Sequence, residues 1–179
     1  MVPGRVPRGT APTAVPAPAG PAEAAARPLE AAAGAFLDEV GGTSGPLFGL
    51  LFQEIAAAVR AGGATSPTAA LAAGVRNGLA AIQRVGEAEV GDKTLVDALA
   101  PAAAALASST ARDPRQALAD AARAAWRGVH DTARMTARRG RASYLGDRAA
   151  GVPDPGAVGI GLLFTAASGP VTTLGPLLR

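Results

Sequence analysis

The stretch that decides how this chain is organised is Gly140–Gly156, which reads GRASYLGDRAAGVPDPG. It follows a long segment of Ala, Leu and Arg at helical spacing, and it brings Arg, Asp and the single Tyr together with several Gly. Asp154-Pro155-Gly156 predicts a helix start, with Asp as the N-cap and Pro at the first helical position. Because a helix N-terminus favours anions and a guanidinium suits phosphate, the stretch is a candidate phosphate site. The alternative is a joint between two helices whose arginines are solvated.

Composition favours a helical domain without cysteine chemistry. The 179 residues contain no Cys, one His and only 3% aromatic residues, and Ala is very frequent. Such a chain is long enough for one domain with a substantial core, and its residues favour helix over strand. Disulfides, thiolate metal sites and multi-histidine metal sites are excluded by the residue counts. His130 itself is expected on a helix surface.

Positive charge is local rather than global. Residues 123–148 carry seven Arg against Asp131 and Asp147, within a chain of formal net charge +3. A basic patch of this kind serves nucleic acid, acidic lipid or a phosphate ligand. We expect no nucleic-acid partner, because no aromatic residues for base stacking are interleaved with the arginines. The start lacks the apolar run of a secretory signal, and we expect a cytoplasmic protein.

Hydrophobic periodicity and helix-boundary residues predict six helices joined by short loops. A Pro/Ala/Gly-rich segment at 1–28 is expected to be disordered, a helical domain occupies 29–168, and 169–179 form a flexible tail. Pro101 is expected to kink the fourth helix. The predicted helices cover 28–40, 46–62, 67–85, 94–108, 114–138 and 155–167.

The predicted fold is an all-α, up-and-down antiparallel bundle or barrel. In such an arrangement alternate loops lie at the same end. The loops after Val40, Val85 and Arg139 therefore share one end, which gathers GGTSG, GDK and GRASYLG. This juxtaposition predicts one composite site rather than three separate loops.

Four stretches resemble the nucleotide-binding L subunit or domain of dihydroxyacetone (glycerone) kinases. They are GGTSGPLFG at 41–49, GDKTLVDAL at 91–99, GRASYLGDR at 140–148 and DPGA at 154–157, in the family's order and at about its spacing. The resemblance implies a barrel of antiparallel helices whose loops at one end hold ADP or ATP with Mg²⁺. It also implies phosphoryl transfer to dihydroxyacetone on a partner K subunit, with a phosphotransferase-system protein as one source of phosphate.

The resemblance carries site residues onto matching positions of this sequence. Thr43 and Ser44 are similar to the phosphate-contacting pair, and Arg141 to the nucleotide-contacting arginine. Gly86 and Leu95 resemble positions on the adenine side. The segment that closes over the nucleotide is similar to Asp154, Pro155 and Gly156. From the residues alone, Thr43-Ser44 and Asp154 can also be interpreted as helix caps. Leu95 can also be interpreted as a residue of the hydrophobic core.

The chain departs from the family before Gly41. Family members carry a first helix and a GDxDHG-type motif whose aspartates hold magnesium, and residues 1–40 contain no match to either. The sequence therefore predicts an N-terminally divergent or truncated barrel without the first helix, and no metal ligands. Asp92 and Asp97 are alternative ligands, although both are expected to order the local turn and helix.

Three functions remain in competition. The first is an ADP- or ATP-binding kinase subunit, and the second is a catalytically defective homologue that acts only as a binding module. The third is a membrane-associated helical protein that uses the uncharged residues Gly156–Leu178, a stretch interrupted by Gly and Pro. We expect the first, without membrane insertion.

Overall fold

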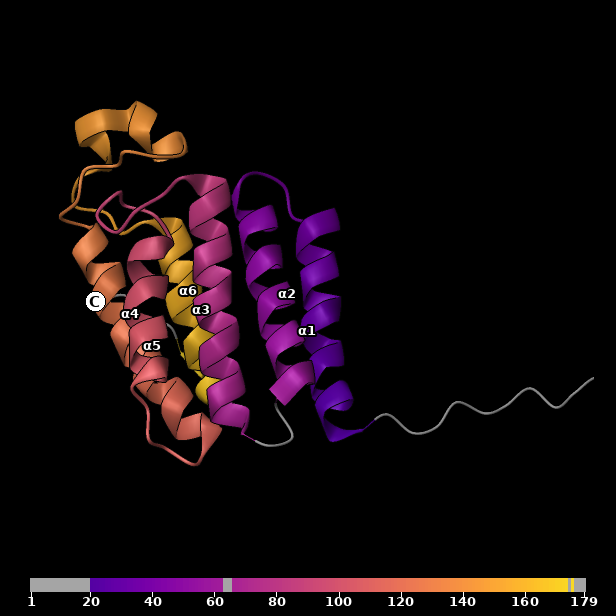
Figure 1. Ribbon diagram of the computed structural model, residues 1–179. Helices are drawn as coiled ribbons and strands as arrows, with labels where there is room; N and C mark the ends of the chain where they lie inside the picture. The colour runs from indigo at the N-terminus through magenta and orange to yellow at the C-terminus, as the bar shows by residue number, and fades with distance from the viewer. Residues whose placement is uncertain (1–19, 63–65, 174, 176–179) are drawn as a thin grey trace, which may run out of the picture.

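A computed structural model describes residues 20–62, 66–173 and 175 of the chain (Figure 1). The described residues form α-helices and one 3-10 segment, with no strand among them. This confirms the all-α prediction. The elements in order are α1 Pro21–Asp38, α2 Ser44–Gly62, α3 Pro67–Gly86, α4 Val96–Ala107, α5 Pro114–Thr132, η1 Arg141–Ala149 and α6 Pro155–Ser168.

Helix starts follow the predicted capping residues. Asp154 Oδ2 accepts a hydrogen bond from Ala157 N at 2.8 Å, and Asp113 Oδ1 accepts one from Arg115 N at 2.9 Å. Ser66 Oγ caps α3 in the same way, and in all three cases Pro follows the cap. A side chain that satisfies a free first-turn N–H and a proline that needs none together fix these starts.

The first helix begins earlier than the sequence predicts. α1 starts at Pro21 rather than at Pro28, so residues 21–28 are helical although composition assigned them to a disordered segment. Ala-rich sequence favours helix, and Ala26 is fully buried, so packing offsets the cost of Pro28 inside the helix. Residues 1–19 of that segment lie outside the described part of the chain, as do 174 and 176–179 of the expected tail.

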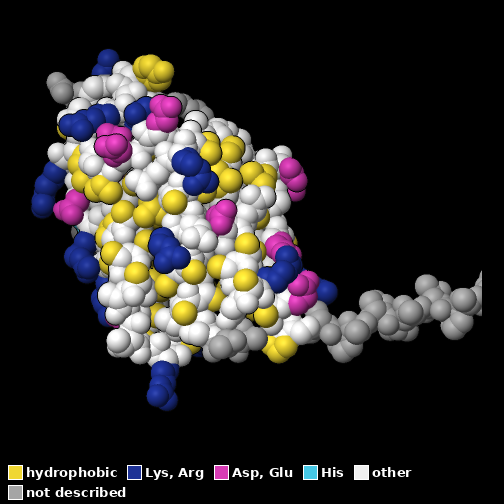
Figure 2. Space-filling model, viewed as in Figure 1, with side chains coloured by type: hydrophobic (Ala, Val, Ile, Leu, Met, Phe, Trp, Pro, Cys, Tyr) yellow, Lys and Arg dark blue, Asp and Glu magenta, His cyan; other side chains and the backbone are white. Residues whose placement is uncertain are grey.

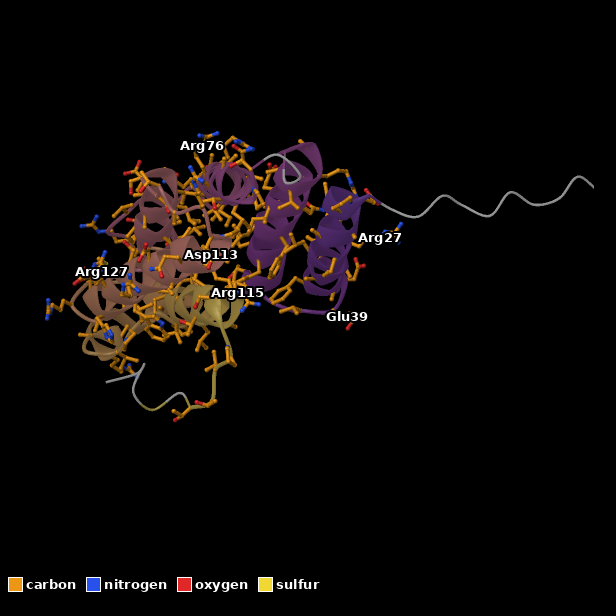
Figure 3. The ribbon with its side chains drawn as sticks, turned by 90° about the horizontal axis from the view of Figure 1, so that it is seen from below. Arg27, Glu39, Arg76, Asp113, Arg115 and Arg127 are labelled. Carbon is orange, nitrogen blue, oxygen red and sulfur yellow. The ribbon has the colours of Figure 1, made fainter. Side chains whose placement is uncertain are left out.

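The helices run up and down, and each packs mainly on its neighbour in sequence (Figure 1). α1 packs chiefly on α2, and the aromatic rings of Phe36 and Phe48 stack there with centroids 5.4 Å apart. Arg60 on α2 pairs with Glu23 and Glu30 on α1. In Figure 3, viewed from below, α2 lies between α1 and the other helices, and Arg27 and Arg127 sit at opposite edges.

The core runs along the length of the bundle. Its largest fully buried apolar side chains are Leu51, Ile82, Leu99, Leu106, Ile160, Val75, Val96 and Val129. Trp126 Nε1 donates to Thr165 Oγ1 at 2.9 Å, which joins α5 to α6. No helix among the described residues is long and apolar enough to cross a membrane.

The loops 39–43, 87–95 and 133–154 all lie at one end of the bundle, as the up-and-down topology predicts (Figure 1). The last of these contains η1, which stands above the helix ends. α5 stops at Thr132, earlier than the predicted 138, and this frees residues 133–140 to join the loop end.

Candidate functional site

A cavity of about 520 Å³ opens at the loop end of the bundle. This volume suits a ligand the size of a nucleotide or cofactor. The cavity lies among the N-termini of α2 and α6, the C-terminus of α3, the 87–95 loop and the chain just before η1. Its lining residues are Gly41, Gly42, Thr43, Ser44, Leu47, Ile82, Gly86, Ala88, Lys93, Thr94, Leu95, Val96, Arg139, Gly140, Ala142, Asp154, Pro155 and Gly156.

One polar wall is the start of α2. Gly42 adopts a φ of 79°, and this turn leads into Thr43 and Ser44, both exposed to the cavity. Gly45 packs so closely on the carbonyl of Val40 that a side chain would collide with it. The first-turn N–H groups of a helix lack partners within that helix, so this wall presents hydrogen-bond donors and positive dipole.

The facing wall is the start of α6. Asp154 N donates to Thr132 Oγ1 at 2.9 Å, which ties the cap to the end of α5. Gly156 allows α6 to approach the 87–95 loop, because a Cβ there would lie 3.1 Å from Leu95 Cβ. Two helix N-termini thus border the same cavity, an arrangement that suits an anionic ligand group.

Asp154 has a perturbed acidity. Desolvation by burial raises its pKa, while hydrogen bonds from the backbone of Ala157 and Gly156 act in the opposite direction. The nearby Asp97 carboxylate also raises the pKa, and the Lys93 ammonium lowers it. The carboxyl therefore holds its proton to higher pH than an ordinary aspartate does.

The GDK turn forms the floor between these walls, and its aspartates bind backbone. Asp97 Oδ1 accepts from Gly91 N at 2.5 Å and Oδ2 accepts from Thr94 N at 2.7 Å. Asp92 Oδ2 accepts from Glu89 N at 2.9 Å. Both carboxylates are buried, at 3% and 8% exposure, and they order the turn as expected.

Lys93 is a site residue that sequence reasoning did not single out. It lies in this turn at φ 60° and is only 3% exposed, yet it lines the cavity. Its Nζ donates to the carbonyl oxygens of Met135 at 3.2 Å and Ala149 at 2.7 Å. The sequence feature that could have drawn attention to this residue is that Lys93 is the only lysine of the chain.

The mouth of the cavity is bordered by the chain that enters η1. Arg139 lines it and pairs with Glu87 at 3.5 Å and with Asp92 at 3.7 Å. Gly140 and Ala142 line it on either side of Arg141. Arg141 begins η1, but its side chain lies outside the described part of the structure. In Figure 2, acidic and basic side chains are interspersed at this upper end of the molecule.

The structure brings together all of the sequence-predicted site residues whose side chains it describes. Thr43, Ser44, Gly86, Leu95 and the Asp154–Gly156 segment line one cavity, although they come from four separate segments. Leu47, Ile82, Ala88 and Val96 add an apolar lining that the sequence analysis did not assign to the site. The cavity therefore combines helix N-termini for an anionic group with an apolar side for a flat or hydrophobic one.

The described carboxylates do not form a metal site made of protein ligands alone. Within residues 20–62, 66–173 and 175, no cluster of three or more His, Cys, Asp or Glu could hold a metal. Asp154 is the only acidic residue among the described residues that line the cavity, and its side chain caps α6. Magnesium at a nucleotide site is commonly held by one or two carboxylates together with water and the substrate phosphates, so this finding concerns only a site built from three or more protein ligands.

Comparison with known proteins places the chain in one family. Residues 12–169 match the DAK2 domain. The chain is similar to L-erythrulose 1-kinase of Mycolicibacterium smegmatis, with 42% identity over 137 residues, 74% of this chain and 23% of that protein. It is also similar to the ADP-binding subunit DhaL of the PEP-dependent dihydroxyacetone kinase of Escherichia coli, with 39% identity over 126 residues, 69% of this chain and 60% of that subunit.

A further relative is dihydroxyacetone kinase 2 of Saccharomyces cerevisiae, which is 38% identical over 143 residues, 74% of this chain and 23% of the yeast protein. The chain thus spans between about a quarter and three fifths of the length of these relatives. The family resemblance carried by the four sequence stretches is confirmed.

Proposed function

The chain belongs to the DAK2 domain family, and on that premise we propose that it is the nucleotide-binding unit of a dihydroxyacetone-type kinase. The cavity at the loop end holds ADP or ATP. One observation carries the proposal: Thr43, Ser44, Gly86, Leu95 and Asp154–Gly156, each assigned to nucleotide by sequence resemblance, line the same cavity.

The chemistry of the walls supports one orientation of the nucleotide. The phosphates lie between the N-termini of α2 and α6, where free N–H groups and both helix dipoles favour negative charge. The base lies against the apolar side formed by Leu47, Ile82 and Leu95. Arg141 closes the site from η1, as the resemblance implies.

The acceptor is held elsewhere. The cavity is sized for one nucleotide, and the relatives are named as kinases of dihydroxyacetone or erythrulose, both short ketoses. We therefore assign the ketose to a partner K subunit or domain, whose bound hydroxyl receives the γ-phosphoryl while ADP remains. The E. coli relative is named as part of a PEP-dependent kinase, so a phosphotransferase-system protein that rephosphorylates bound ADP is one source of phosphate. A cytoplasmic location belongs to the same proposal.

Calorimetric titration of the purified chain with ADP, with and without Mg²⁺, tests the proposal. We expect saturable binding at one site, and GDP as control should bind about tenfold more weakly, because the apolar side would leave the additional polar group of guanine buried without a hydrogen-bond partner. No binding of ADP under either condition would contradict the proposal. Binding without phosphoryl transfer to a ketose in the presence of a K subunit would favour the alternative, a nucleotide-binding module without activity.

A further inference from the structure

Lys93 is the only lysine among the 17 Lys and Arg residues of the chain. It is also 3% exposed, whereas long cationic side chains are ordinarily solvated. Its backbone has a φ of 60°, a conformation that residues other than glycine rarely adopt. Buried Asp97 accepts hydrogen bonds from Gly91 N and Thr94 N on either side and holds the turn in this shape.

The contacts of the ammonium point to the role of this residue. Lys93 Nζ donates to Met135 O at 3.2 Å and to Ala149 O at 2.7 Å. These two carbonyls bracket residues 136–148, which contain most of η1 and the chain that lines the cavity mouth at Gly140 and Ala142. One buried group therefore holds both ends of the overhanging segment.

The other contacts of this segment are weaker or peripheral. Arg139 pairs with Glu87, but the two side chains are 46% and 80% exposed, and exposed ion pairs contribute little. Arg138 and Arg139 also pair with Asp92, at 3.8 and 3.7 Å, but both guanidinium groups are exposed and these separations are longer than a hydrogen bond. Arg138 N donates to Asp92 O at 3.0 Å, and Gly151 N donates to Ala133 O at 2.9 Å, each at a single point. Hydrogen bonds from a charged donor are stronger than such neutral ones, so the Lys93 contacts dominate.

We propose that Lys93 is a positioning residue whose ammonium clamps the two ends of residues 136–148 and so keeps Arg141 at the mouth of the cavity. A compact ammonium directs three donors to different sides, whereas a guanidinium is planar and larger. This geometry explains why lysine stands here in a chain that otherwise uses arginine. The effect of this clamp on nucleotide binding rests on the proposed function, whereas the clamp itself does not.

The first test uses the wild-type chain and needs no nucleotide. NMR of the side-chain ammonium should show one slowly exchanging, hydrogen-bonded signal, because the chain has one lysine. Reaction with an amine-specific acetylating reagent, located by peptide mapping, should be at least about tenfold slower at Lys93 than in the urea-unfolded chain, as expected for a buried charge-assisted donor. A Lys93 ammonium that exchanges and reacts as a free lysine does would overturn the proposal.

The second test compares Lys93→Met with Arg134→Met. Both remove one positive charge near the loop end, but Arg134 is exposed and contacts only Asp131, at 3.8 Å, among its recorded ion pairs. We expect hydrogen exchange of residues 136–148 to accelerate at least about tenfold in Lys93→Met alone, from the loss of two charged hydrogen bonds, while the helix cores exchange as before. Equal exchange in the two variants would overturn the proposal.

ADP titration of the same variants links the clamp to the cavity. Lys93→Met should weaken ADP binding by about tenfold or more relative to Arg134→Met, and Lys93→Arg should restore only part of the loss. Accelerated exchange with unchanged affinity would overturn the link between clamp and cavity. If the wild type itself binds no ADP, the proposed function fails, whereas the ammonium and exchange measurements still decide the clamp.

Discussion

Gly128 on α5 lies directly against the backbone carbonyl of Asp97 on α4, so closely that a side chain at Gly128 would overlap that oxygen. Glycine therefore permits the helices to touch backbone to backbone at this crossing. Asp97 in turn accepts the N–H groups of Gly91 and Thr94 through its carboxylate. The crossing of two helices thus sets the position of the turn on the cavity floor.

Gly128→Ala should destabilise the fold. The added methyl meets backbone, which cannot rotate away, so we expect a loss of about 2–3 kcal/mol or more in the free energy of unfolding, as for other overpacked sites. Urea denaturation measures the change. Gly34→Ala is the matched control, since Gly34 also lies inside a helix but has open space around its Cβ position. The control should gain about 0.5–1 kcal/mol from helix propensity, and a comparable loss in both variants would contradict this account of the crossing.

Asp97→Asn should loosen the GDK turn. Asparagine offers one oxygen acceptor in place of two, so either Gly91 N or Thr94 N faces an amide donor instead of an acceptor. We expect the free energy of unfolding to fall by about 1.5–3 kcal/mol, the range for a charged hydrogen bond. The exposed Asp131→Asn, which breaks only a 3.8 Å ion pair with Arg134, serves as control and should change stability by less than about 0.5 kcal/mol. Similar losses in both variants would show that the Asp97 hydrogen bonds do not hold the turn.

Asp154→Asn should alter the pH dependence of stability. Burial raises the pKa of Asp154 in the folded state above its ordinary value of 3.8, so the folded chain binds this proton more tightly than the unfolded chain does. The wild type therefore loses stability from this group as pH rises from about 3.8 through the raised folded pKa.

Asparagine still caps the helix but does not titrate, so the stability of Asp154→Asn relative to wild type should rise over this pH window and then level off. Urea midpoints of both proteins at a series of pH values measure the difference. A relative stability that falls with increasing pH would mean that the Asp154 pKa is lowered rather than raised.

Arg141→Ala should weaken ADP binding without loss of stability. The expectation rests on the sequence resemblance and on the place of Arg141 between the cavity-lining Gly140 and Ala142. An arginine that contacts phosphate contributes about 1.5–3 kcal/mol, which corresponds to a tenfold or larger rise in Kd. Arg115→Ala is the control, because Arg115 (labelled in Figure 3) lies on the first turn of α5, at the end of the bundle away from the cavity. Equal effects of the two substitutions on ADP affinity would count against a site at η1.

Sequence alone predicted the elements that depend on local chemistry. The caps at Ser66, Asp113 and Asp154, each followed by proline, predicted three helix starts that the structure confirms. Alternation of helix direction predicted that the loops after α1, α3 and α5 meet, and these loops border one cavity. Nucleotide contact by the residues that line it stays a prediction.

The end of α5 could not be read from sequence. Residues 133–139 contain no glycine or proline, so helical periodicity carried the prediction on to Arg138. In the structure, backbone groups of this segment form hydrogen bonds with distant parts of the chain instead of continuing the helix. Arg138 N donates to Asp92 O, and Ala133 O accepts from Gly151 N. The role of Lys93 was missed for the same reason, because its acceptors lie 42 and 56 residues away in the chain.

The one-sided attachment of α1 has a consequence for the order in which the molecule comes apart. Because α1 packs chiefly on α2, it is expected to open as a sub-global unit at a lower free energy than the buried helices. Its hinge is the Gly41–Thr43 turn, which also borders the cavity. Whatever fills the cavity therefore bridges this hinge to the start of α6, and its binding should suppress the opening of the outermost helix. Binding of a ligand in the cavity would then be detected as slower hydrogen exchange in α1, the outermost helix.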